Sequence, residues 1–170
     1  MDIFQRAFTT TVGLEGGYSS LSADPGNWTG GAPNAGDLKG TKYGISAASY
    51  PTLDIATLTL DQARAIYKRD YWDRIGADAL APSLALLAFD AAVNNGVGRA
   101  KQWLQLVQRQ PDARAACIEF MAQRILFMAS LPGWRNFGLG WARRLARLPY
   151  EVAVIGGEEH EPDVGQGLRT

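Results

Sequence analysis

The sequence of 170 residues has little of what would assign it to a class at once. Its single cysteine, Cys117, excludes a disulfide within the chain, and its apolar neighbours indicate a small core side chain. No two His, Cys or carboxylate residues show the spacing of metal ligands, so we predict neither a metal nor a cofactor. No apolar stretch approaches the ~20 residues of a spanning helix, so we expect no stable membrane insertion.

The chain also lacks net charge, because 17 basic side chains balance 17 acidic ones. This balance argues against nucleic acid as a partner, and the 10% aromatic content argues against disorder. The N-terminal residues include an acid at position 2 and no long apolar run, a pattern that does not fit a secretory signal. We therefore expect a soluble monomer that is made in the cytoplasm.

The charges that sum to zero are distributed unevenly along the chain. Residues 99–150 carry nine basic and two acidic side chains, whereas residues 151–170 carry one and five. The first stretch therefore has a net charge of +7 and the second of −4. Solvated helix faces beside a frayed end would explain this asymmetry, and so would attraction of a polyanionic partner.

Apolar periodicity and capping residues predict a mainly α fold. A first helix is expected from Asp2, its N-cap, to about Gly16-Gly17. Thr59 and Gln62 form a capping box that begins a second helix. Further helices, the first opened by a proline and stopped by a glycine, are predicted over 83–95, 98–108, 112–130 and 136–148.

A glycine-rich segment separates the first two predicted helices. Residues 16–44 contain eight glycines and two prolines, which leave room only for turns and short β-strands. A segment of this length and composition inside a small domain is usually functional or mobile.

Two carboxylates, Glu15 and Asp24, lie at the start of this segment. Cleavage of a glycosidic bond needs such a pair, since one group protonates the leaving oxygen while the other activates water or stabilises the transition state. Glu15 is expected at the C-terminus of the first helix, where the helix dipole and apolar neighbours would raise its pKa. Asp24, in a polar turn, is expected to stay ionised. Each residue alone also fits an ordinary role, as a helix-terminal or a turn-forming acid.

The carboxylates belong to a series of short motifs. In chain order these are Glu15-Gly16-Gly17-Tyr18-Ser19, Asp24-Pro25-Gly26, Gly40-Thr41-Lys42-Tyr43-Gly44-Ile45-Ser46, Arg69-Asp70-Tyr71-Trp72-Asp73, Phe89-Asp90-Ala91-Ala92-Val93-Asn94-Asn95-Gly96 and Gly140-Trp141-Ala142-Arg143-Arg144. The series resembles glycoside hydrolase family 108, which comprises phage- and secretion-associated N-acetylmuramidases with a lysozyme-like fold. The resemblance covers residues 1–150.

The resemblance implies hydrolysis of the β-1,4 bond between N-acetylmuramic acid and N-acetylglucosamine in peptidoglycan. It assigns the proton donor to Glu15 and the second carboxylate to Asp24. In the similar phage-type lysozymes a threonine helps to hold the water, and its best match here is Thr41. Because residues 27–39 interrupt the compact pattern, Thr29 is the alternative.

Further candidate residues would bind the substrate: Tyr18, Trp28, Tyr43, Asp90 and Asn94. The aromatic rings, like that of Tyr50, could stack on sugar rings or pack the loop onto the helices. Asp90 and Asn94, one turn apart on an apolar helix, could bind substrate or pair internally.

The implied organisation is a lysozyme-like catalytic region over 1–75, a helical peptidoglycan-binding region over 76–150 and an acidic flexible tail over 151–170. Peptidoglycan glycan strands are the implied partner. The enzyme would reach them in the periplasm through a holin-type lesion or a dedicated export route. Two alternatives stay open: a lytic transglycosylase, which needs a single acid, and a non-hydrolytic peptidoglycan-binding or secretion-accessory protein.

Overall fold

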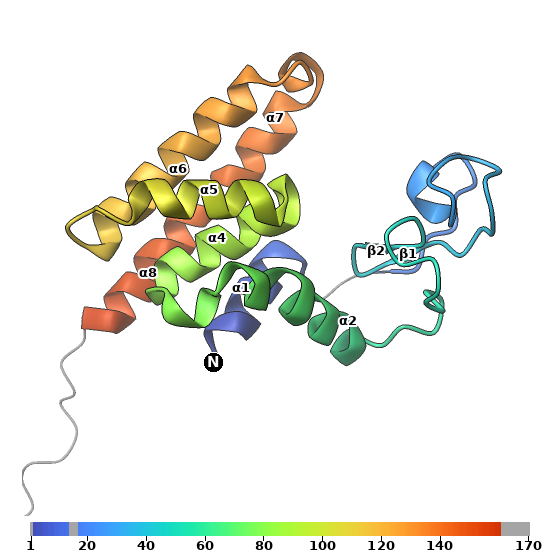
Figure 1. Ribbon diagram of the computed structural model, residues 1–170, viewed down its shortest axis with the longest axis horizontal. Helices are drawn as coiled ribbons and strands as arrows, with labels where there is room; N and C mark the ends of the chain where they lie inside the picture. The colour runs from blue at the N-terminus through green and yellow to red at the C-terminus, as the bar shows by residue number, and fades with distance from the viewer. Residues whose placement is uncertain (1, 14–16, 161–170) are drawn as a thin grey trace, which may run out of the picture. The chain divides into compact units, whose positions relative to one another are not determined.

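The computed structural model describes residues 2–13 and 17–160, and the chain divides into two compact units, Met1–Trp72 and Asp73–Thr170 (Figure 1). The second unit is built mainly of helices, whereas the first combines helical segments with the long glycine-rich segment, which contains the only sheet in the described residues, of two short strands. The mainly α, lysozyme-like fold predicted from the sequence is therefore confirmed. The division lies close to the predicted boundary at 75/76, while the separate roles of the two regions stay predictions.

The first unit has an aromatic core. Helix α1 (Ile3–Thr11) buries Phe4 and Phe8, which are one turn apart on the same face. The ring of Phe4 packs edge-on against Trp72, with centroids 5.3 Å apart, and that of Phe8 against Tyr67 at 5.5 Å. These contacts join α1 to the end of α2 (Leu60–Tyr67) and to the π-helix η2 (Lys68–Trp72) that follows it.

Helix α1 ends earlier than the sequence suggested. Its last residue is Thr11, and Gly13 follows with φ of 83° and donates its N–H to the carbonyl oxygen of Thr9. A left-handed glycine just beyond the helix is a common C-terminal signal. The predicted end near Gly16-Gly17 is wrong, because Gly13 provides this conformation first.

The glycine-rich segment contains the short strands for which the sequence left room. Strand β1 (Thr41–Lys42) pairs antiparallel with β2 (Ile45–Ser46). The two-residue turn between them, Tyr43-Gly44, has positive φ at both positions, 52° and 73°, which is the backbone of a type I′ hairpin turn. Helix α2 then begins at the capping box that Thr59 and Gln62 were predicted to form.

The second unit is a bundle centred on α4. Its elements are α3 (Asp73–Ile75), the 3-10 helix η3 (Ala77–Ala79), α4 (Pro82–Asn95), α5 (Val97–Val107), α6 (Ala113–Ser130), α7 (Trp134–Leu145) and α8 (Leu148–His160). Every residue of α4 from 83 to 92 is buried, and α5, α6 and α8 all pack against this helix. Pro82 begins α4 and Gly96, with φ of 88°, ends it, as predicted.

Helix α8 corrects the predicted tail. The sequence suggested a flexible end from residue 151, but the chain is helical to His160. Leu148 and Ile155, two turns apart, are buried, and α8 packs on α4. This packing accounts for a helix in a stretch whose acidic composition favoured disorder. Residues 161–170 lie outside the described part of the chain. None of the described helices is long and apolar enough to cross a membrane.

Candidate active site

The motif stretches of the first unit are joined through the backbone. Ser19, which ends the motif containing Glu15, exchanges two backbone hydrogen bonds with Thr41, of 2.9 and 2.8 Å. The ring of the neighbouring Tyr18 lies against Gly40, where a Cβ atom would come within 2.5 Å of Cε2. Gly40 also has φ of 82°, so both its conformation and its contact require glycine.

Asp24 caps the 3-10 helix η1 (Pro25–Asn27). Its Oδ1 accepts a hydrogen bond of 2.9 Å from the N–H of Gly26. The second oxygen, Oδ2, accepts no hydrogen bond from any described residue, and the side chain is exposed. This carboxylate is therefore held by one oxygen and can offer the other to water or a substrate.

Asn27 links the Asp24 turn to the strand region. Its side chain is completely buried, and Nδ2 donates to the carbonyl oxygen of Leu21 at 3.0 Å. Its backbone N–H donates to the carbonyl oxygen of Asp24, and its own carbonyl oxygen accepts from the N–H groups of both Lys39 and Gly40. One buried residue therefore fixes the Asp24 turn next to the residue that precedes Thr41.

Glu15, the predicted proton donor, lies outside the described residues. The helix that was expected to carry it ends at Thr11. The role of Glu15 as proton donor stays a prediction.

The two candidate threonines differ in their surroundings. Thr29 Oγ1 accepts a hydrogen bond of 2.8 Å from the N–H of Asp37. In return, the backbone N–H of Thr29 donates to the carbonyl oxygen of Asp37. Next to these hydrogen bonds, Trp28 and Leu38 form an isolated antiparallel β-bridge. Thr29 therefore closes the base of a hairpin-like excursion. Thr41 is half-buried, and its hydroxyl has no hydrogen-bond partner among the described residues.

The three aromatic candidates of this unit keep part of their rings accessible. Tyr18 is 45% exposed, while Trp28 and Tyr43 are half-buried. Trp28 Nε1 donates to the carbonyl oxygen of Ser22 at 2.8 Å, which orients the indole. Whether these rings stack on sugars stays a prediction.

The turn at Tyr43 is anchored from α2. The hydroxyl of Tyr67 donates to the carbonyl oxygen of Tyr43 at 3.1 Å. Burial, and next the proximity of Tyr71, raises the pKa of Tyr67 to about 12. The hydroxyl therefore stays protonated at neutral pH and able to donate.

Tyr50 packs internally, one of the two roles left open for it. Its hydroxyl donates to Asp70 Oδ2 at 2.8 Å, and Arg69 binds both oxygens of the same carboxylate at 2.7 and 2.6 Å. Burial and the hydrogen bond to Asp70 raise the pKa of Tyr50. The group connects the glycine-rich segment to η2, so Arg69 and Asp70 have a structural role in this unit.

Asp90 also takes the internal role that the sequence left open. It is 2% exposed, and its Oδ1 lies 2.7 Å from Nη2 of Arg124, which is fully buried. Burial lowers the pKa of Arg124, an effect that Asp90 opposes. Asp90 is thus corrected from a substrate-binding candidate to half of a buried ion pair. Asn94 is exposed, and its Nδ2 donates to the carbonyl oxygen of Asp90.

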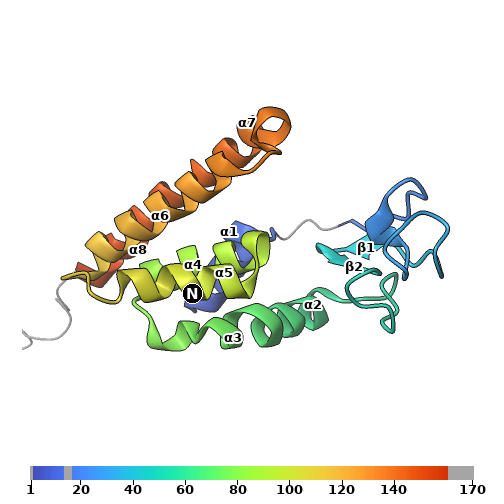
Figure 2. The ribbon, with the colours of Figure 1, turned by 45° about the horizontal axis from the view of Figure 1, so that its top comes forward.

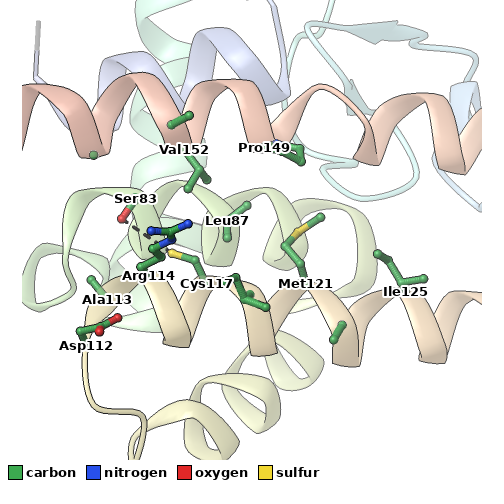
Figure 3. Close-up of a pocket in the computed structure, with 14 residues that line it drawn as sticks. Ser83, Leu87, Asp112, Ala113, Arg114, Cys117, Met121, Ile125, Pro149 and Val152 are labelled. Atoms are coloured by element: carbon green, nitrogen blue, oxygen red, sulfur yellow. Dashed lines mark hydrogen bonds between the residues drawn. The ribbon is translucent and has the colours of Figure 1, made fainter.

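The second unit contains an apolar groove of about 940 Å³ between α6 and α8, with α4 behind it (Figure 3). In the groove the thiol of Cys117 lies 3.7 Å from the hydroxyl oxygen of Ser83. Asp112 is the single acid of the lining, and it caps α6 by accepting from the N–H of Ala115. A groove with one committed carboxylate lacks the pair that glycoside hydrolysis needs. Across the described residues no three His, Cys, Asp or Glu side chains are grouped to hold a metal.

Sequence reasoning missed two residues that position this site, Asn27 and Tyr67. Asn27 follows directly on Asp24-Pro25-Gly26, and its place in that motif was the available signal. Tyr67 carried no local signal, because its partner, Tyr43, lies in a distant turn.

Comparisons with known proteins identify the family and the fold. The family model described as glycosyl hydrolase 108 matches residues 8–96, which include the Asp24 turn and β1. Among solved structures, SagA of Brucella abortus has a TM-score of 0.69 and 24% identity, over 89% of this chain and 94% of that one. That likeness shows a shared fold. No curated protein matches the sequence. The family match extends over more than half of the chain, which therefore belongs to the glycosyl hydrolase 108 family of peptidoglycan-degrading glycosidases.

Proposed function

We propose that this glycosidase is an N-acetylmuramidase, which hydrolyses the β-1,4 bond between N-acetylmuramic acid and N-acetylglucosamine. The observation that carries the proposal is the hydrogen-bond network through Asn27, which joins the Asp24 turn to the strand of Thr41 while Asp24 stays exposed. Family membership supports peptidoglycan hydrolysis in general, and the exposed carboxylate supports a direct part for this chain in the reaction.

In the proposed reaction, the carboxylic acid of Glu15 gives its proton to the glycosidic oxygen as the bond from that oxygen to C1 breaks. Positive charge develops on the ring, and the Asp24 carboxylate either stabilises it or removes a proton from the attacking water. The Thr41 hydroxyl orients that water. The products are a reducing N-acetylmuramic acid end and a free hydroxyl on the leaving sugar. If the reaction inverts the configuration, the two carboxyl groups lie roughly 6.5–9.5 Å apart, and if it retains it, about 5–5.5 Å apart.

The experiment is mass spectrometry of the muropeptides released from purified sacculi. The wild type should release reducing products, and Glu15→Gln and Asp24→Asn should each lower the rate by about 10²–10⁴-fold. Asp37→Asn is the matched control, since Asp37 is another exposed acid of the same glycine-rich segment, and it should digest sacculi like the wild type.

Three outcomes would contradict the proposal. Anhydro products with an active Asp24→Asn variant would identify a lytic transglycosylase. Binding of sacculi without release of fragments by the wild type would identify a non-hydrolytic accessory protein. Undiminished digestion by Glu15→Gln would show that the acid lies elsewhere.

We further propose that the enzyme acts as a phage- or prophage-type endolysin, or with a secretion system, and meets the wall after release from the cytoplasm. Expression in a bacterial host should leave cells intact until a holin or a membrane-permeabilising agent is added, and lysis should then follow. Lysis on expression alone would contradict this dependence. Glu15→Gln with the same treatment controls for damage by the agent itself.

A further inference from the structure

Helix α7 and the turn after it carry positive charge that the described residues do not balance. Arg135, Arg143, Arg144 and Arg147 are all exposed, and none forms an ion pair with a described residue. Residues 120–150 contain no acid at all. Like charges so close together repel each other in the folded protein, so this surface gains from an anionic partner.

Apolar side chains lie exposed among these arginines. Leu139 is 67% exposed and stands one helical turn from both Arg135 and Arg143, so it shares their face. The neighbouring helix α6 runs alongside α7 in both views and packs on it (Figures 1 and 2). Leu139 therefore provides an apolar side chain between two cations on a surface that the rest of the described unit leaves open.

Aromatic rings gather at the start of the same helix. The Trp134 and Trp141 rings have centroids 6.1 Å apart, and Phe137 lies 6.2 Å from Trp141 and is 60% exposed. Gly138 makes room for this cluster, because a Cβ atom there would lie 2.8 Å from the indole of Trp134. Trp134, Phe137 and Trp141, at spacings of three and four, lie on a different side of α7 from Leu139, so this cluster leaves the side of Arg135, Leu139 and Arg143 free.

We propose that this surface, the α7 arginine face (Arg135, Leu139, Arg143 and Arg147, at successive spacings of four), docks the protein on an anionic lipid bilayer. The guanidinium groups bind lipid phosphates, and Leu139 enters the headgroup region between them. The protein stays at the surface, held by several weak contacts, and no segment spans the bilayer. This docking is independent of the proposed hydrolysis.

The mixture of groups on the face favours lipid over a wall polymer. Peptidoglycan also carries carboxylates, but sugars are bound through hydrogen bonds and flat ring faces, to which an exposed leucine adds little. A bilayer surface presents closely spaced phosphates above an apolar layer, and it accommodates arginine and leucine together.

The test is cosedimentation of the whole protein with vesicles of phosphatidylcholine, alone or mixed with phosphatidylglycerol. The wild type should bind the mixed vesicles and be released by salt. Each arginine removed should weaken binding by about fivefold, so Arg135→Gln, Arg143→Gln and Arg147→Gln together should weaken it by about a hundredfold. Leu139→Ser should weaken it by about tenfold. The three matching lysine substitutions should retain binding.

A matched control changes three other exposed cations of the same unit, Lys101, Arg109 and Arg114, to glutamine. It alters net charge equally and should keep most of the binding. Equal loss in this control would show diffuse charge attraction and would overturn the α7 arginine face. Binding to phosphatidylcholine alone, or no effect of Leu139→Ser, would overturn the bilayer mode. If the triple glutamine variant lost affinity only for lipid-free sacculi, the partner would be the wall.

Discussion

Arg124 on α6 and Asp90 on α4 form an ion pair of 2.7 Å in the interior of the helical unit. The guanidinium also donates from Nε to Asn95 Oδ1 at 2.9 Å, so it contacts both the middle and the end of α4. The pair therefore fixes the position of one helix along the other. Neither charge has access to bulk water that could replace its partner.

Loss of one partner of this pair should destabilise the protein strongly. Arg124→Met leaves the Asp90 carboxylate buried without its cation, and the free energy of unfolding should fall by about 3–5 kcal/mol in denaturant titrations. The double variant with Asp90→Leu should recover much of this loss, because no charge is then buried alone. Arg109→Met, at an exposed position, is the control. A single variant as stable as the control would contradict the role of the pair.

The hairpin turn Tyr43-Gly44 should respond in opposite directions to two substitutions. Gly44→Ala forces a Cβ atom to within 2.6 Å of the Tyr67 hydroxyl at positive φ, and it should lower unfolding free energy by about 1–2 kcal/mol or more. Tyr43→Asn places a residue that tolerates left-handed backbone and should raise it by about 0.5–1 kcal/mol. Gly140→Ala, in a helix with open space, should stabilise slightly. Equal effects of both alanine substitutions would contradict this account.

Stability should decline at alkaline pH partly through Tyr67. Its pKa is raised to about 12 from 10.0, so the unfolded chain loses this proton first, and the contribution to stability is complete below pH 10. As the pH rises from 10 towards 12, this residue should account for a loss of about 2 kcal/mol. Thermal unfolding of wild type and Tyr67→Phe against pH checks this, since the variant should show the shallower decline. Parallel curves would refute the assignment.

The two threonines should separate catalysis from stability. Thr41→Val should lower kcat on soluble glycan strands by about tenfold or more with little change in melting temperature, because its hydroxyl is proposed to orient water. Thr29→Val removes the acceptor for the Asp37 N–H, and it should lower unfolding free energy by about 1 kcal/mol while kcat stays near the wild-type value. The reverse pattern would transfer the catalytic role to Thr29.

Digestion of lipid-free sacculi should depend on salt. The net charge of +7 over residues 99–150 should attract the carboxylates of wall peptides, and added salt should screen this attraction. Turbidity assays should show slower clearing as ionic strength rises from low values to ~0.3 M. Constant rates over this range would mean that the positive charge plays no part in binding the wall.

Fold features that depend only on residues adjacent in the sequence were predicted well. The capping box at Thr59 and the limits of α4 at Pro82 and Gly96 are local chemistry and are confirmed. Helix α8 was missed because its stability comes from burial of Ile155 against α4, which composition does not reveal. The end of α1 was misjudged because several glycines could have supplied the left-handed residue, and Gly13 is the first of them.

The same distinction holds for the candidate site. Asp24 and its turn were recognised from a short motif, and the structure describes how the turn is held. The partner of Asp90 could not be read from the sequence, because Arg124 is brought to it only by the packing of α6 on α4. Likewise, the sequence could not show that the Thr29 hydroxyl is already used as the acceptor for the Asp37 N–H.

The π-helix η2 has a consequence for the register of the chain. Tyr67 and Trp72 are five residues apart, a spacing that in an α-helix would turn them to different faces, yet both are buried against Phe4 and Phe8 of α1. The wider turn, which bonds residues five apart, aligns them. Deleting one residue from Lys68–Trp72 would restore α-helical geometry in this turn. Each residue after the deletion would then take the helix position of its predecessor. The length of this turn is therefore as much a determinant of the aromatic core as the identity of its rings.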